Sequence, residues 1–310
     1  SFLAGEPKNI TALYVTVDPL LACVSSADEN LARDSIGALE CLTVSAEVRS
    51  HVRRANGVRP ILRRFNSAAC SSNLRAKCET LKVIRNLCLS TECRKDVLQP
   101  PSLASQKVFL DALVDDTLRS SLSDLRRETF VLLQLLLKDT SVLDALKQSH
   151  LMENILPALD DKKEIKLLGC ALACMQDLFC HQQYRSQFHT FGGIHRLLKL
   201  VDSHENTIRD AVFALVCSYA QDGPGLQALF DLQFISIALS AIKDSSDGAK
   251  ANIIRIFLRF IQDHRDGKRD LVQSGAAKTF KVYESSPNDT VRELSKRGID
   301  LLKNSEDMRR

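Results

Sequence analysis

Apolar residues recur at helical spacing along most of the chain. Within residues 192–201, four apolar positions fall at i, i+3, i+4 and i+7, which places them on one face of a helix. They are Ile194, Leu197, Leu198 and Val201. Gly192 and Gly193 come first, where glycine lets the chain turn without strain from a Cβ atom. Just upstream, residues 167–179 form a longer apolar run that predicts another helix.

The same arrangement recurs. An apolar residue stands six positions before each short helix begins, and these residues are 45, 49, 42, 41 and 42 positions apart. They are Val52, Val97, Leu146, Phe188, Leu229 and Leu271, and six positions later come Val58, Leu103, Met152, Ile194, Ile235 and Ala277. The widest interval contains Pro100 and Pro101, which predict a loop insertion between helices. A period of roughly 40–47 residues is typical of helical arrays of the armadillo and HEAT type.

A long apolar helix, a short polar break and a glycine-led helix together resemble the second and third helices of an armadillo repeat. This resemblance implies an all-α fold, a right-handed α-solenoid of about six degenerate armadillo-like repeats with capping helices. We therefore predict one array over residues 1–310. Its parts are an N-terminal cap at 1–28, repeats at 29–67, 68–116, 117–161, 162–203, 204–244 and 245–285, and a C-terminal capping helix and tail at 286–310.

The first 28 residues leave two interpretations open. Residues 13–17, Leu-Tyr-Val-Thr-Val, could form a short strand. Asp18 as an N-cap and Pro19 in the first turn instead predict a helix over residues 18–24, and we favour this helix as the cap that a solenoid end requires. At the other end we expect Asp289 to cap a last helix and residues 304–310 to fray.

Composition favours a helical fold and indicates the cellular compartment of the protein. The chain has 12 Gly, 8 Pro and no Trp, and its net charge of +4 implies no nucleic-acid role by itself. Its ten cysteines lack the spacing of a disulfide framework. A zinc site at Cys170, Cys174, Cys180 and His181 is one interpretation, but we favour cysteines as small buried apolar residues. Unpaired cysteines predict a cytoplasmic location, with a nuclear or a cytoskeletal or ciliary site as alternatives.

No targeting or membrane segment is recognisable. The first residues lack the basic flank and apolar core of a signal peptide, and no apolar run reaches the roughly 18–20 residues of a membrane span. The chain opens on Ser1 rather than on Met, which suggests a trimmed chain or a fragment. We expect no membrane partner.

Positive charge is concentrated near the N-terminus. Residues 49–95 hold 12 Lys and Arg against two Glu, a net charge of +10. We predict that Arg53, Arg59, Arg63 and Arg85 converge on one end of a groove and bind an acidic or phosphorylated protein segment, because Arg suits carboxylate and phosphate groups. The alternative is that these long side chains only solvate the surface. RNA ranks lower, because the segment has only Phe65 for base stacking.

Armadillo proteins of the importin and catenin type hold an extended peptide with a ladder of asparagines, along a groove lined by the third helix of each repeat. In this chain the resemblance supplies one such residue, Asn86, and the equivalent positions carry other residues. These are approximately Cys41, Gln134, Asp177, Ser218 and Phe260. One asparagine and no tryptophan disfavour the importin-type recognition of a basic nuclear signal.

Residues 178–242 also resemble the armadillo core of the nucleotide-exchange co-chaperones that bind heat-shock ATPases. The matching features are Ile208-Arg209-Asp210-Ala211, Gln221-Asp222 and Leu229-Phe230. This resemblance implies a second function, the stimulation of nucleotide release by such an ATPase.

The sequence offers little for catalysis. None of the seven histidines forms a spaced motif with Cys, Asp or Glu, and Gly192-Gly193 follows no predicted strand as a phosphate loop would. We therefore expect no enzyme activity, no cofactor, no metal and no small-molecule ligand. The leading prediction is a scaffold or adaptor that binds a protein partner along its concave groove.

Overall fold

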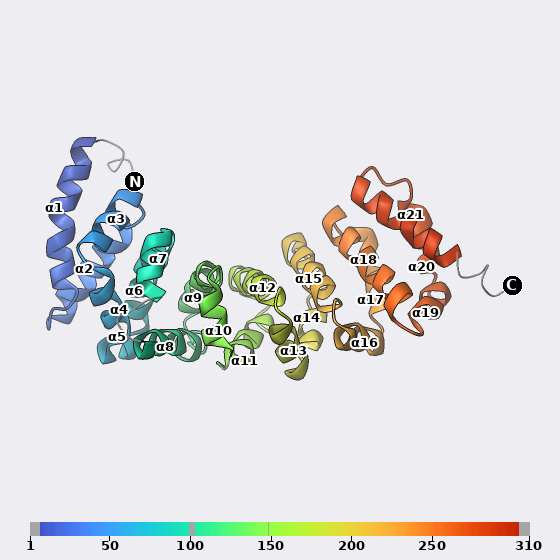
Figure 1. Ribbon diagram of the computed structural model, residues 1–310, viewed down its shortest axis with the longest axis horizontal. Coiled ribbons are helices and arrows are strands. Elements are labelled where there is room, and N and C mark those ends of the chain that lie inside the picture. Colours follow the sequence, from blue (N-terminus) through green and yellow to red (C-terminus); the bar gives the residue numbers. More distant parts are fainter. Residues whose placement is uncertain (1–6, 99–102, 148, 304–310) are drawn as a thin grey trace. The chain divides into compact units, whose positions relative to one another are not determined.

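The computed structural model describes residues 7–98, 103–147 and 149–303, and all regular structure in these residues is helical (Figure 1). This confirms the all-α prediction. By its internal contacts the chain divides into two compact units, Ser1–Ile155 and Leu156–Arg310. The single array over residues 1–310 and the bounds of its cap, repeats and tail stay predictions. Pro100 and Pro101, with the predicted loop insertion, and the tail at 304–310 lie outside the described residues.

Unit 1 is built from long helices in one layer and short helices in another. Its elements are α1 (Pro7–Cys23), α2 (Glu29–Leu42), α3 (Ala46–Arg54), α4 (Val58–Phe65), α5 (Ala68–Ser72), α6 (Leu74–Cys88), α7 (Thr91–Leu98), α8 (Leu103–Asp111), the π-helical η2 (Ala112–Thr117), α9 (Ser123–Leu136), α10 (Thr140–Leu146) and α11 (Leu151–Ile155). The long helices pack in succession, α2 on α6 and α6 on α9. The short helices α3 and α4 pack on the short helix α7, and α4 also packs on the long helix α6. The layer of short helices thus covers one side of the layer of long helices.

Unit 2 repeats the same plan. Its elements are the 3-10 helix η3 (Leu156–Leu159), α12 (Ile165–Phe179), α13 (Gln182–Thr190), α14 (Gly193–Leu198), α15 (Asn206–Tyr219), α16 (Gly223–Asp231), α17 (Phe234–Ala241), the 3-10 helix η4 (Ile242–Asp244), α18 (Asp247–Asp263), α19 (Gly267–Gln273), α20 (Ala276–Tyr283) and α21 (Asp289–Lys303). The long helices again pack in order, α12 on α15, α15 on α18 and α18 on α21. Each short pair therefore precedes one long helix.

The repeating apolar residues of the sequence form the seam of this architecture. All six residues that set the period are buried, each at most 1% exposed. They lie in the last turn or two of the first short helix of each repeat: α3, α7, α10, α13, α16 and α19. Full burial of such a side chain contributes roughly 1.5–3 kcal/mol to the stability of the fold. The period read from the sequence is thus a period of buried contacts.

The turn between the two short helices recurs in the backbone. A residue with positive φ stands there in four repeats, and the angles are 54° at Asn56, 66° at Gly192, 54° at Gln233 and 84° at Gly275. Glycine and asparagine reach this left-handed region at little cost. At Gly193 a Cβ atom would lie 2.3 Å from the Phe188 ring, so the second glycine of the pair allows the two short helices to approach closely.

The order of helices differs from the interpretation of residues 167–201. The glycine-led helix α14 does not follow the long helix α12 directly, because α13 lies between them. Residues 182–190 are mostly polar and bury few side chains, among them Tyr184 and Phe188, so they gave no apolar run. In the structure α14 is the middle helix of three, and the long α15 comes third.

The N-terminal helix also differs from its prediction. It spans Pro7–Cys23, so neither a strand over residues 13–17 nor a helix start at Asp18 is correct. Pro19 lies inside the helix, where it removes one backbone hydrogen bond. Packing compensates for that loss, because Val17, Leu21 and Val24 are buried and α1 contacts both α2 and α3.

No single helix in the described ranges is long and apolar enough to cross a membrane, although one pair bent by 77°, Gly223–Asp231 with Phe234–Asp244, passes the same test of length and composition.

Candidate functional site

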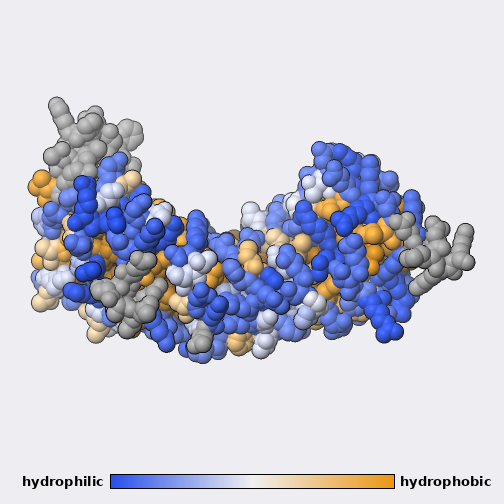
Figure 2. Space-filling view, in the orientation of Figure 1, coloured by the Kyte–Doolittle hydropathy of each residue, from blue (hydrophilic) through white to orange (hydrophobic). Residues whose placement is uncertain are grey.

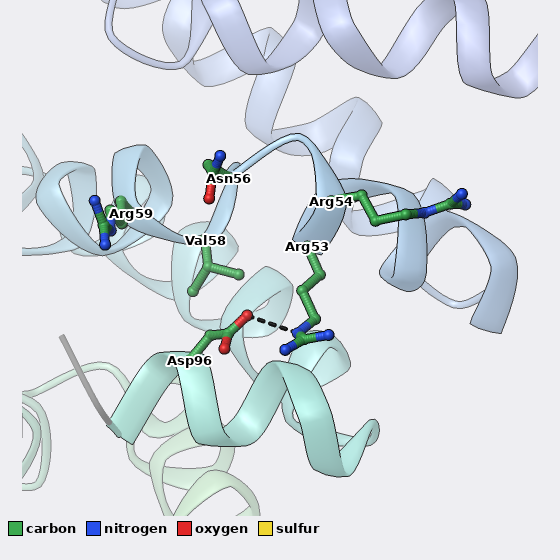
Figure 3. A pocket seen from close by; sticks show the side chains of 6 residues that line it. All are labelled: Arg53, Arg54, Asn56, Val58, Arg59 and Asp96. Carbon is green, nitrogen blue, oxygen red and sulfur yellow. Dashed lines mark hydrogen bonds and ion pairs between the residues drawn. The ribbon is translucent and has the colours of Figure 1, made fainter.

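An open pocket of about 260 Å³ lies between α3, α4 and α7 (Figure 3). We call it the N-terminal basic pocket. Its lining is Arg53, Arg54, Asn56, Val58, Arg59 and Asp96. It therefore brings together Arg53 and Arg59, two of the residues predicted to bind a partner, and adds Asn56 and Asp96, which the sequence did not single out.

The turn from α3 to α4 shapes this pocket. Asn56 takes a positive φ of 54°, and Gly57 then packs so closely on α1 that a Cβ atom would lie 2.6 Å from the methyl carbons of Leu21. Val58 is buried at the start of α4. Arg59 and Arg63 are one helical turn apart on α4 and both are exposed. The buried turn thus fixes where the two guanidinium groups emerge.

The charges around the pocket are only partly neutralised. The Arg53 Nε donates to the Asp96 Oδ2 at 2.8 Å, with 45% and 38% of the two side chains exposed. Figure 3 shows this pair bridging α3 and α7, with Asn56 on the loop nearby. In contrast, Arg59 and Arg63 have no hydrogen-bond or ion-pair partner among the residues that the structure describes. They are available to an incoming anion.

Arg85 and Asn86 do not join the pocket. Both lie on α6, where the Arg85 Nε is 3.3 Å from the Oε2 of Glu128, a carboxylate of α9 that is almost buried. Asn86 is only 4% exposed, and its side-chain amide donates to the Glu40 carbonyl and to the Thr43 Oγ1 at 3.1 and 3.2 Å. The one candidate ladder asparagine therefore ties α6 to the end of α2.

Most other cations of segment 49–95 are also used inside the fold. Arg64 is 7% exposed and donates hydrogen bonds to both carboxylate oxygens of Glu29, at 3.0 and 2.5 Å. Lys77 is 3% exposed and its Nζ lies 3.0 Å from the Asp116 Oδ2. Lys82 pairs with Glu40 at 3.3 Å. The carboxylates come from outside the segment, so its net charge of +10 greatly overstates the positive surface.

The titration of these groups reflects the same pairing. The hydrogen bond from Arg64 lowers the pKa of Glu29, with a smaller opposing effect of burial. In the same segment, burial raises the pKa of the Cys78 thiol to about 11, although Lys82 acts in the other direction. Glu128, Asp124 and Glu40 add to the upward shift. The carboxylates that neighbouring helices supply thus offset the positive charge around this thiol.

Half of the ten cysteines are buried as packing residues, three are half-buried, and Cys41 and Cys180 are exposed. All ten lie in the described ranges and none forms a disulfide; Cys174 is fully buried, whereas Cys180 is exposed. Within the described ranges, no three His, Cys, Asp or Glu side chains are placed to hold a metal ion. Burial also raises the pKa of the Cys174 and Cys88 thiols, which makes both poor nucleophiles.

The residues that suggested a co-chaperone serve contacts within unit 2. Asp222 accepts from Arg185 at 2.6 and 3.0 Å, and Arg209 donates to the Asp244 carbonyl at 3.0 Å. Ile208 and Leu229 are buried. Contacts within the fold are therefore enough to account for these residues, with no need of a chaperone partner. A role in nucleotide exchange stays a prediction, which a nucleotide-release assay tests.

Comparison with known proteins gives matches of structure alone. No protein-family model and no curated protein matches the sequence. An engineered protein solved by the Northeast Structural Genomics Consortium superposes with a TM-score of 0.79 at 15% identity, over 96% of this chain and 71% of the other. A β-catenin structure, from work on a phosphorylation switch that controls its interaction with cadherin, gives a TM-score of 0.75 at 15% identity. That match covers 99% of this chain, which spans 61% of the other.

A designed armadillo repeat protein is also found, with a TM-score of 0.49 at 14% identity over 92% of this chain and 99% of the other. The two matches with TM-scores of 0.79 and 0.75, each at 15% identity, report the fold, and the match at 0.49 is not used for it. The fold agrees with the period of buried residues, with the helix triplets and with the stacked long helices described above. The chain therefore has the armadillo-repeat α-solenoid fold that its sequence resembles.

Proposed function

We propose that this chain is a non-enzymatic scaffold that binds a protein partner, and that the N-terminal basic pocket receives an acidic or phosphorylated segment of that partner. The observation that carries the proposal is the pair of guanidinium groups of Arg59, which lines the pocket, and of Arg63, one helical turn further along α4, with no partner among the described residues. Arginine presents a planar set of donors that matches carboxylate and phosphate oxygens. The β-catenin match is consistent with this proposal, since that protein interacts with cadherin.

The Arg53–Asp96 pair fits the same role. Both side chains are more than a third exposed, so the pair is screened by water and contributes little to stability. Arg53 can therefore turn from Asp96 to an incoming anion at small cost. An anion bound between Arg53 and Arg59 would meet two guanidinium groups held by two different helices, which favours a group with several oxygens such as a phosphate.

Direct binding tests the proposal. The probes are a fluorescein-labelled peptide rich in glutamate and its phosphoserine counterpart, added to the full chain and followed by fluorescence anisotropy. We expect Arg59→Glu/Arg63→Glu to weaken binding at least about tenfold, since each charge-assisted hydrogen bond contributes about 1.5–3 kcal/mol.

A charge-matched control separates the pocket from general electrostatics. Arg75 and Lys107 are exposed on α6 and α8 and do not line the pocket. Arg75→Glu/Lys107→Glu changes the net charge by the same amount, and we expect binding within about twofold of the wild type. Equal losses in the two double variants would mean that the peptide binds through net charge alone and would contradict the pocket.

A further inference from the structure

A second, larger pocket lies in unit 2, where α18 ends and α19, α20 and α21 meet. It is open and has a volume of about 770 Å³. We call it the C-terminal pocket. Figure 2 shows hydrophobic surface interspersed with hydrophilic surface over these last helices. This pocket shares no residue with the N-terminal basic pocket, so a role for it is independent of the proposed function.

The floor of the C-terminal pocket is aliphatic. Ile261, Val272, Ile299 and Leu302 line it, from three different helices. Val272 is 51% exposed, and the other three are only half-buried. This apolar floor remains in contact with water, so a partner that covers it removes apolar surface from water and thereby stabilises the complex.

The rim is basic. Arg265, Lys281 and Lys303 are exposed at the pocket and have no ion-pair partner among the described residues. Arg269 differs, since it lies 3.3 Å from Asp266 and 3.8 Å from Asp270. Lys268 donates to the carbonyls of Leu301 and Leu302 and so closes the end of α21. Three cations thus surround the floor without an internal role among the described residues.

We infer that the C-terminal pocket binds an acidic protein segment that carries aliphatic side chains. Carboxylates on such a segment complement the three free cations, and its aliphatic side chains cover the floor. A single-stranded nucleic acid would also meet the cations. It would need aromatic side chains for its bases, and the only aromatic ring in the described lining is that of His264, which stacks on Phe230 at 4.0 Å between ring centroids.

Binding of two matched peptides to the full chain tests this inference. In the first peptide two leucines are flanked by glutamates, and in the second serines replace the leucines. We expect Arg265→Glu/Lys281→Glu and Val272→Asp each to weaken the first peptide at least about tenfold. We expect the serine peptide to bind the wild type at least about tenfold more weakly than the leucine peptide, because the floor then stays uncovered.

Neighbouring positions supply the controls. Val282 is 67% exposed on α20 but does not line the pocket, so Val282→Asp should leave the affinity within about twofold. Lys278 and Arg297 are exposed and also lie outside the lining, so Lys278→Glu/Arg297→Glu controls for net charge. All of these variants are made in an Arg59→Glu/Arg63→Glu background, so that glutamates of the peptide do not also bind at the N-terminal basic pocket.

Three results would overturn the inference. One is equal affinity for the leucine and serine peptides, which would remove the role of the floor. Another is equal or tighter binding of a single-stranded oligonucleotide of the same charge, lost in the same variants. The third is peptide binding that requires removal of residues 304–310, which would assign the pocket to a segment of this chain rather than to a partner.

Discussion

The two pockets use positive charge in opposite ways. In segment 49–95 the sequence is far more basic, yet most of its cations bind carboxylates or carbonyls of the fold. Arg59, at the pocket, and Arg63, one turn further along α4, stay free of described partners. Around the C-terminal pocket the cations are fewer, but three of them have no described partner and surround an aliphatic floor. The comparison teaches that the cations of a basic segment stay unpaired only where the helices packed against them supply no acid.

The strongest way to test this comparison is to break a pair that neighbouring repeats share. Arg185 is 8% exposed, donates to both oxygens of Asp222 at 2.6 and 3.0 Å, and also donates to the Phe179 carbonyl. We expect Arg185→Ala to lower the free energy of unfolding by about 3 kcal/mol, because it leaves a partly buried carboxylate and a carbonyl without their donor. Urea denaturation measures this.

Asp222→Asn serves as a milder partner variant, because it keeps an acceptor for Arg185 but removes the charge. A loss below about 0.5 kcal/mol in Arg185→Ala would mean that enclosed pairs between repeats do not hold this fold together.

A buried thiol sharpens the comparison, since its pKa depends on its burial first and then on the charges around it in the basic segment. Burial raises the pKa of Cys78 from an ordinary value of 9.0 to about 11. Below about pH 9 the thiol is protonated in both the folded and the unfolded chain, so stability does not depend on it. Between about pH 9 and pH 11 only the unfolded chain ionises, and the fold loses about 1.4 kcal/mol per pH unit from this group.

We therefore expect Cys78→Ala to lose less stability than the wild type between pH 9 and pH 10, in urea denaturation under reducing conditions. The other buried thiols are present in both proteins, so the difference isolates Cys78. If the two proteins lose the same stability, the thiol ionises inside the fold at its ordinary pKa, and the segment is more positive at its core than its pairing suggests.

The sequence predicted the repeats well because one physical requirement sets both the period of apolar residues in the sequence and the repeat of the fold. Residues such as Val52, Phe188 and Leu271 must be buried once per repeat, and that burial leaves a period in the sequence. The order of helices within a repeat was harder, since α13 is largely polar and buries few side chains. The helix of residues 7–23 was misjudged because packing of Val17 and Leu21 outweighs the local effect of Pro19.

The candidate site was predicted only in part. Arg53 and Arg59 do meet in a pocket, but Arg85 pairs with Glu128, 43 positions away, and Asn86 reaches the Glu40 carbonyl, 46 positions away. A charge count over a window cannot include carboxylates that a neighbouring repeat brings in. The C-terminal pocket was missed for a related reason, because its floor and rim come from four separate stretches of sequence.

Two adjacent arginines allow the most direct test of the account. Arg64 is 7% exposed and bound to Glu29, whereas Arg63, the residue before it, is exposed and free of described partners. Urea denaturation of Arg63→Ala and Arg64→Ala compares them. We predict that Arg64→Ala is less stable than the wild type by about 1 kcal/mol, since Glu29 is half-exposed and partly screened, and that Arg63→Ala is unchanged within about 0.5 kcal/mol. Equal stability of the two variants would contradict the claim that contacts between packed helices decide which cations remain free for a partner.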